Sequence, residues 1–155
     1  MFNIPTVTVA KTTLTGTSSS VTLTYVAPSV AWTPRHLLLR VNGRTTRGTT
    51  NAAIEIRLNG DDGSNYSSQF LNAGGTTAAA AISTDKDYLW KCFAPGTSVA
   101  SSAFGGGECL ITDALSTRSF KTFIGQAATV EAYFQQEVGR WENTAAITSV
   151  TFLAD

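Results

Sequence analysis

The sequence predicts an all-β fold: a jelly-roll-like antiparallel β-sandwich that forms a single domain over residues 1–155. Short segments in which apolar and polar side chains alternate recur along most of the chain, and this period of two is typical of half-buried strands. Turns rich in Gly, Asn, Asp, Ser or Pro separate the segments, and no segment sustains the 3.6-residue period of a helix. Roughly nine or ten short strands at such spacing favour two packed antiparallel sheets.

The strand expected over Ala53–Leu58 is the clearest of these units. Its apolar members are Ile54, Ile56 and Leu58, and its polar members are Glu55 and Arg57. We expect the apolar members to point into the core and the polar members to point outward. The following segment, Asn59–Gly63, consists of residues that form turns easily, so the strand should end there.

Three further strands are expected in the first part of the chain, at Thr6–Ala10, Val21–Val26 and Arg35–Asn42. The last of them has a less strictly alternating apolar run, which favours a strand covered on both faces. Two prolines indicate a loop over residues 27–34, since neither fits a central strand. Residues 43–51 are rich in Arg, Thr and Gly, and we expect an exposed loop or hairpin tip.

The second part of the chain continues the pattern. Strands are expected at Tyr66–Leu71, Asp87–Phe93, Glu108–Thr112, Ser119–Gln126, Val130–Val138 and Ala145–Leu153. Loops are expected at Ala73–Ala81, Ala94–Gly107, Ala127–Ala128 and Gly139–Asn143. The alanines of the first loop follow glycines and threonines, and a helix this short is marginal in water, so at most one helical turn is expected there.

Composition restricts the class of partner. The formal net charge is zero, charged residues make up 14% of the chain, and the Lys and Arg residues are scattered. Nucleic-acid binding usually needs a basic face, so no nucleic-acid partner is expected. A surface whose polarity comes from Thr, Ser, Asn and Gly suits an extracellular or particle-bound protein that meets other proteins. Without an export signal, Cys92 and Cys109 are expected to be free, buried thiols.

The first residues do not have the basic and apolar regions of a signal peptide, and no apolar run approaches the length of a membrane span. We therefore expect no membrane partner. Residues 1–5 are interpreted as an N-terminal arm whose apolar side chains, Phe2, Ile4 and Pro5, can dock on a neighbour or extend a sheet edge.

Motifs for catalysis or metal binding are weak. His36 is the only histidine, and no nearby pattern supplies a partner for it, so it is interpreted as a partly buried strand residue. Oxygen ligands for calcium occur at Asn59, Asp61, Asp62 and Asn65. The EF-hand order is absent and such residues are typical of turns, so a structural turn is favoured over calcium. The glycines at 105–107 lack the Lys-Ser/Thr of a phosphate loop.

Carboxylates and aromatic residues leave two further alternatives. Pairs of glycosidase acids would come from Asp61, Asp62, Glu108, Asp113, Glu131 and Glu137, and sequence places no two of them together. A sugar-stacking platform would come from Trp32, Trp90, Trp141, Tyr25, Tyr66, Tyr88 and Tyr133. Most of these aromatics are flanked by alternating apolar residues, so core or subunit interface is favoured. Trp141 is expected in a polar turn, packed over a sheet edge or into a neighbour. No catalytic residue, cofactor or metal is predicted.

Three elements, taken together and in order, resemble a family of small tailed-bacteriophage virion structural proteins. The first is Ile56–Asp61 with Asn65-Tyr66, similar to I-x-L/F-N-G-D…N-Y. The second is Leu110–Asp113, Ser116-Thr117 and Phe120-Lys121-Thr122, similar to I-x-D-Y-x-S/T-x-x-x-K-T/S. The third is Gly139-Arg140-Trp141 with Thr144–Val150, similar to G-x-W-x-x-T-x-A-I-T-S-I/V.

The resemblance implies a jelly-roll-type sandwich that decorates a phage head or belongs to a tail or fibre. Two departures stand out: Ala114 replaces an aromatic residue, and the family continues with a further strand beyond the position of Asp155. That closing strand would be missing here or supplied by a neighbouring subunit. The elements are structural, so the resemblance transfers no catalytic residue.

The sequence thus predicts a non-enzymatic virion protein, foremost a capsid decoration or cement protein that binds the major capsid protein. The alternatives are a tail-tip or tail-fibre domain and a carbohydrate-binding module that contacts the host surface. Its location would be the virion, assembled in the host bacterial cytoplasm, and the resemblance implies a homo-oligomer, with a trimer favoured. The candidate interface residues are Phe2, Ile4, Pro5, Arg44, Arg47 and Trp141.

Overall fold

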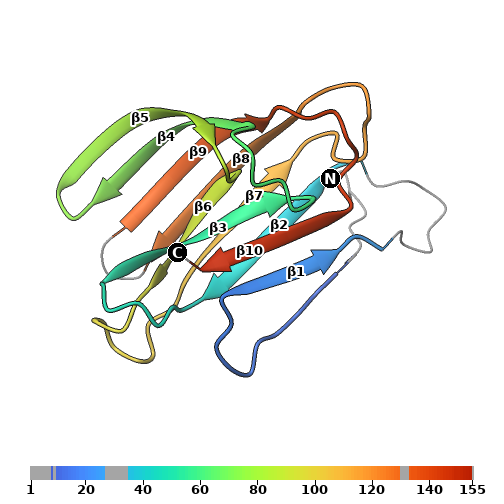
Figure 1. Cartoon of the computed structure of the whole chain (residues 1–155). Coiled ribbons are helices and arrows are strands. Elements are labelled where there is room, and N and C mark those ends of the chain that lie inside the picture. Colours follow the sequence, from blue (N-terminus) through green and yellow to red (C-terminus); the bar gives the residue numbers. More distant parts are fainter. Residues whose placement is uncertain (1–7, 9, 27–34, 130–132, 155) are drawn as a thin grey trace, which may run out of the picture.

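The computed structural model describes residues 8, 10–26, 35–129 and 133–154. In this part of the chain ten strands form two antiparallel sheets, and there is no helix (Figure 1). The prediction of an all-β sandwich is confirmed.

The smaller sheet has four strands in the order β1-β10-β3-β6. Their bounds are β1 Ser20–Thr24, β10 Ser149–Ala154, β3 Asn51–Leu58 and β6 Trp90–Pro95. The larger sheet has six strands in the order β2-β7-β8-β9-β4-β5. Their bounds are β2 Leu37–Gly43, β7 Gly105–Ile111, β8 Lys121–Thr129, β9 Tyr133–Trp141, β4 Tyr66–Gly74 and β5 Thr77–Lys86.

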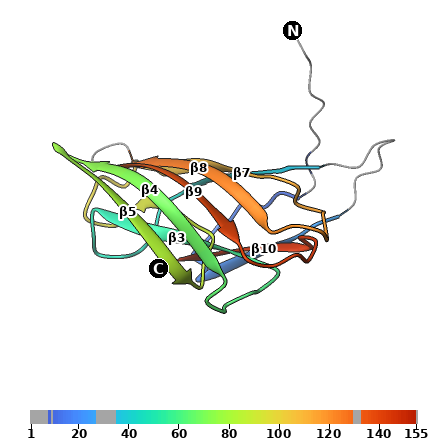
Figure 2. The same cartoon turned by 90° about the horizontal axis from the view of Figure 1, so that it is seen from above.

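The connections give the sandwich its jelly-roll-like character. The chain changes sheet between β1 and β2, β2 and β3, β3 and β4, β5 and β6, β6 and β7, and β9 and β10. The last strand, β10, returns to lie between the first strand and the third. Such long returns between sheets are typical of Greek-key sandwiches. The hairpin of β4 and β5 lies at one side of the molecule (Figure 2).

The core lies between the sheets, and β3 contributes to it as predicted. Ile56 and Leu58 are fully buried, and Ile54 packs against the buried cluster. On the opposite side of the strand, Glu55 forms an ion pair with Lys91 of β6, and Arg57 forms an ion pair with Asp87, which precedes β6. The alternation of apolar and polar residues therefore sets the orientation of this strand.

Trp90 of β6 fills the centre of the core against two glycines of the larger sheet. A Cβ atom at Gly107 would lie 2.9 Å from Cη2 of Trp90, and one at Gly125 would lie 2.7 Å from its Nε1. The indole thus packs directly on the backbone of β7 and β8. Both cysteines are free and buried, as predicted, and burial raises the pKa of the Cys92 thiol to about 12.

The largest error of the sequence prediction concerns the alanine-rich segment Ala73–Ala81, expected as a loop. It forms the end of β4, a turn and the first half of β5. Gly75 adopts a left-handed backbone with φ of 58° in the turn, which lets the chain reverse. The segment shows no alternation of apolar and polar residues that would indicate a strand, because alanine occupies both faces. Its conformation is decided by pairing with β4.

Several boundaries were also wrong. β2 is not covered on both faces, since Leu37 is 7% exposed and Leu38 is 47% exposed. The small residues at 105–107 and 127–128, expected in loops, belong to β7 and β8. Of the three glycines, Gly107 lies against Trp90. β9 extends through Trp141, which was expected in a turn. The strand expected at Thr6–Ala10 falls largely outside the described residues, and neither Thr8 nor Ala10 lies in a strand.

Candidate functional site

The outer face of the six-stranded sheet carries an exposed row of aliphatic side chains. Leu38, Leu110, Ile124 and Val138 come from β2, β7, β8 and β9 and stand directly opposite one another in the strand register. We call these four residues the apolar row. Their exposed fractions are 47%, 41%, 55% and 43%, so none is covered by the described chain.

Other apolar side chains enlarge this face. Phe134 of β9 is 43% exposed, and Leu71 of β4 is 49% exposed. Both stand on the same side of the sheet as the apolar row, because they lie an even number of residues from its members or their partners. Exposed apolar residues scattered singly need no explanation, whereas a continuous set on one face marks an interaction surface.

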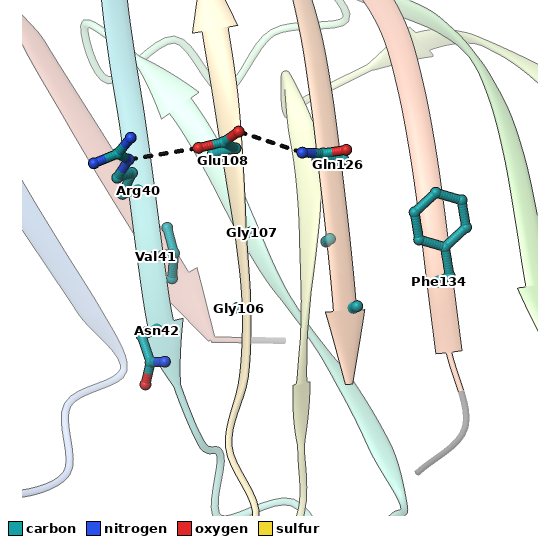
Figure 3. A pocket seen from close by; sticks show the side chains of 10 residues that line it. Arg40, Val41, Asn42, Gly106, Gly107, Glu108, Gln126 and Phe134 are labelled. Atoms are coloured by element: carbon teal, nitrogen blue, oxygen red, sulfur yellow. Dashed lines mark hydrogen bonds and ion pairs between the residues drawn. The ribbon is translucent and has the colours of Figure 1, made fainter. Parts of the chain in front are cut away.

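Polar residues border the apolar row. In the neighbouring register, Arg40 Nε lies 3.5 Å from Glu108 Oε2, and Gln126 Nε2 donates to Glu108 Oε1 at 3.3 Å (Figure 3). Across the row, Arg140 is paired with Glu142 at 2.8 Å. An apolar centre with a rim of satisfied polar groups is the usual organisation of a protein interface.

A shallow depression lies next to this border (Figure 3). Its floor is formed by Gly106 and Gly107 of β7 and by Ala127 and Ala128 of β8, which have little or no side chain. The ionisable groups that line it, Arg40 and Glu108, are engaged with each other. The depression adds relief to the outer face and brings together no acid–base pair or nucleophile among its lining residues.

The three sequence elements that resemble the phage family meet at one end of the sandwich. The Asn59 side chain donates to Ala146 O at 2.8 Å, and its Oδ1 accepts from the backbone N–H groups of Thr148 and Ser149 at 2.7 and 3.1 Å. Asn59 has φ of 54°, a conformation that Asn tolerates well. The first element is thereby fixed to the third through backbone groups.

Asp61 joins the same two elements. Its carboxylate accepts hydrogen bonds from Trp141 Nε1 at 2.6 Å, from Gly63 N at 3.0 Å and from Asn65 Nδ2 at 3.0 Å. Burial raises the pKa of Asp61, but these donors outweigh it and hold the pKa below its ordinary value. Trp141 also stacks with Tyr66, whose hydroxyl accepts from Leu58 N at 3.1 Å.

Lys121 connects the second element to the third. It is fully buried, and its Nζ donates to Ser116 O at 2.7 Å, Ser119 O at 3.0 Å and Thr144 O at 3.1 Å. Burial lowers the pKa of Lys121 below its ordinary value. The three carbonyls use all three ammonium donors, so this lysine is a fixed structural cation that stabilises two loops.

These contacts show how the turn after β3 is held. The oxygen atoms of Asn59 and Asp61 are occupied by protein donors, as expected for a structural turn. Among the described residues no group of three or more His, Cys, Asp or Glu side chains is placed to hold a metal ion.

The other candidate residues lie apart. His36 is exposed, and its Nδ1 accepts from Asp113 N at 3.2 Å. The Asp113 carboxylate pairs with Arg35 at 2.5 Å. Glu137 is a buried residue of β9. Its Oε2 accepts a hydrogen bond from Gln135 Nε2 at 2.7 Å, and burial raises the pKa of its carboxyl group. Glu131 lies outside the described residues. The sequence pattern alone does not indicate that Glu137 is buried, because its burial depends on the strands and the second sheet that pack around β9.

The candidate interface residues lie in different environments. Trp141 is 1% exposed and part of the core, so its assignment to an interface is corrected. Arg44 donates to the carbonyls of Val99, Ala100 and Ala103 and fixes that loop. Arg47 is exposed in the loop between β2 and β3. Phe2, Ile4 and Pro5 lie outside the described residues, and the arm at residues 1–5 stays a prediction.

The sequence analysis does not predict the apolar row, because its four members come from four different strands and only the register between strands aligns them. The alternation in β8 and β9 contained the signal, since Ile124 and Val138 fall on the side opposite to buried Phe123 and Glu137. Comparisons with protein-family models, curated proteins and solved structures find no match to this chain. The described residues include no helix that is long and apolar enough to span a membrane.

Proposed function

We propose that this chain is a non-enzymatic structural protein of a bacteriophage particle, foremost a capsid decoration protein, and that it binds other virion proteins through the outer face of the six-stranded sheet. The observation that carries the proposal is the apolar row, a set of four aliphatic side chains aligned across four strands and exposed to solvent. Burial of such side chains against a partner stabilises the complex by roughly 25 cal/mol per Å² of apolar surface.

The contacts among the three elements that resemble the phage family accord with the structural role that the resemblance implies. The three elements that resemble the phage family hold one another through Asn59, Asp61 and Lys121. Because these residues hold loops together, the sequence pattern that contains them would specify a fold and no catalytic site. The location on a virion and the identity of the capsid partner rest on the resemblance.

Within the described chain the carbohydrate-binding alternative has weaker support. Sugar binding by stacking needs exposed aromatic rings in a row. The outer face presents Phe134 among aliphatic side chains, whereas Trp90, Trp141 and Tyr66 are buried. A tail-tip or tail-fibre location uses the same face in the same way, and it is distinguished from the capsid by locating the chain in the particle by electron microscopy.

The attachment is tested with Ile124→Lys, at the centre of the apolar row. Ile124 is 55% exposed, so the variant should fold, while a desolvated lysine in the interface should abolish attachment to particles that lack the chain. Ser20→Lys, on exposed β1 of the other sheet, adds the same charge elsewhere and should leave attachment intact. Co-sedimentation with the particles measures both.

A salt wash separates apolar from electrostatic attachment. At ~1 M salt the Debye length is about 3 Å, so ion pairs at the surface are screened while apolar burial persists. We expect the protein to stay on the particle. Release by salt, or normal attachment of the Ile124→Lys variant, would overturn the assignment of this face. Retention of Ile124→Lys together with release after deletion of residues 1–5 would assign attachment to the N-terminal arm.

A further inference from the structure

The open edge of β5 is unusual for a strand at the end of a sheet. Among the described strands β5 pairs with β4 alone, so the backbone groups along its other edge have no strand partner there. It is ten residues long and lies at one side of the molecule (Figures 1 and 2). The side chains from Thr77 to Ile82 are exposed on both faces. Such an edge is a template for pairing with another strand.

Proteins normally protect a free edge with charges, prolines or bulges. In β5 these devices are confined to the end of the strand. Asp85 and Lys86 provide the charges, and the register with β4 shifts by one residue at the same place, where Asp85 has φ of 55°. The seven residues Thr77–Ser83 contain no charge and no proline. The unprotected length is therefore long enough to pair as a strand.

The side chains of β5 give it little stability of its own. Alanine is depleted in strands and buries almost no apolar surface, while each ordered residue loses backbone entropy. Four of the seven unprotected residues are alanine. Hydrogen bonds to a strand on the open side would compensate for this, and the small side chains allow another backbone to approach without steric conflict.

We propose that the open edge of β5 is a pairing surface for β5 of a second copy of this chain, with the two strands antiparallel about a two-fold axis. Opposing residues of an antiparallel pair share one face of the sheet, so the axis lies at a residue and not between two residues. Near the middle of the unprotected length, that residue is Ala80 or Ala81. This joins two six-stranded sheets into one continuous sheet. The edge is separate from the apolar row, so one chain can pair with its copy and bind a particle at the same time.

Self-complementarity favours a second copy as the occupant. With the axis at Ala80, Ala78 faces Ile82 and Thr77 faces Ser83 of the other copy. With the axis at Ala81, Ala79 faces Ser83 and Thr77 faces Asp85. Neither register places like charges opposite each other, and the one charged residue that enters a pair, Asp85, faces a threonine hydroxyl.

Cysteine cross-linking of the purified chain tests the geometry. Ala80→Cys and Ala81→Cys are prepared separately, and each is oxidised and analysed on a non-reducing gel. One of the two should form a disulfide-linked dimer, because its Cβ atoms face each other across the axis. Gln69→Cys, on exposed β4 one strand inward, is the matched control and should stay monomeric. Native Cys92 and Cys109 are buried and should not react.

Charge repulsion tests the energetics. In a concentration series by analytical ultracentrifugation the wild-type chain should dimerise. The double variant Ala80→Lys/Ala81→Lys places lysine on the axis in either register and should weaken dimerisation by about tenfold or more. Gln69→Lys adds an exposed charge on β4 and should dimerise normally, and thermal melting confirms that both variants fold.

Two results would overturn the proposal. One is a wild-type chain that stays monomeric throughout the series with no cross-link at either position. The other is a dimer that survives the double lysine variant and is lost with Ile124→Lys, which would assign self-association to the apolar row. A dimer that forms through β5 while Ile124→Lys fails to bind particles would separate the two surfaces.

Discussion

Single buried polar residues fix one end of this sandwich. Lys121 illustrates the principle, because a buried cation persists only where its donors are all satisfied. Its three carbonyl partners belong to the loops before β8 and after β9, so one side chain holds two loops that are distant in sequence. The same logic applies to Asp61 and Trp141.

Replacement of Lys121 should reveal this contribution. In Lys121→Met the aliphatic stem is kept, but three carbonyl groups lose their donor, and we expect a loss of about 2–4 kcal/mol in the free energy of unfolding. Urea denaturation followed by tryptophan fluorescence measures it. Lys11→Met, at an exposed position, should change stability by less than about 0.5 kcal/mol. Equal effects would contradict the structural role of Lys121.

Asp61 makes stability depend on pH. Its folded-state pKa is lowered, so the unfolded chain binds a proton more readily, and the stabilisation is present above the ordinary carboxyl value of about 4. It is lost as the pH falls through the folded-state pKa. Thermal melting of wild type and Asp61→Asn should therefore show a gap at pH 7 that narrows progressively as the pH falls below about 4. Asp62→Asn, at the exposed neighbouring position, should show no gap.

At the scale of elements, strands β7 and β8 are shaped by one tryptophan. Trp90 lies against the backbone at Gly107 and Gly125, so small residues are required in strands that would otherwise favour β-branched ones. In the glycine-rich segment of β7 this contact accounts for Gly107, whereas a Cβ at Gly105 or Gly106 would meet the backbone carbonyl of Phe93 or Val41. The bare backbone on the outer side also produces the depression next to Arg40 and Glu108.

Enlargement of Gly125 should be destabilising. The Cβ of Gly125→Ala would meet the Trp90 indole at 2.7–3.0 Å, and overpacking of this kind costs about 1–3 kcal/mol. Gly48→Ala places its Cβ in open space and serves as the control, with an expected change below about 1 kcal/mol. Chemical denaturation measures both. A Gly125 variant as stable as the control would mean that Trp90 can shift.

At the scale of the whole molecule, the two faces of the larger sheet have different tasks. One face packs on the smaller sheet around Trp90, while the other presents the apolar row to solvent. An ordinary half-exposed sheet has a polar outer face, so this face departs from the pattern that the fold requires. The exposed apolar row on this face is the surface through which the proposed attachment to other virion proteins would occur.

The fold itself gives a simple prediction. The described residues contain strands and no helix, so far-ultraviolet circular dichroism should give a β spectrum. Helical content above about a quarter, near the level of an ordinary globular domain, would contradict the sandwich. The spectrum of Ile124→Lys should match that of the wild type, which is the condition for interpreting its loss of attachment.

By itself the sequence determined the fold class, the inward side of β3 and the turn after it, because alternation and turn residues are local signals. It also predicted that Cys92 and Cys109 are free and buried. Only the tertiary structure decided that the alanine-rich segment is a strand, since its conformation comes from pairing with β4. The buried state of Lys121 and Trp141 depends likewise on contacts with distant loops. The apolar row has the same origin: four strands each contribute one residue, and only the register between strands aligns them into a surface.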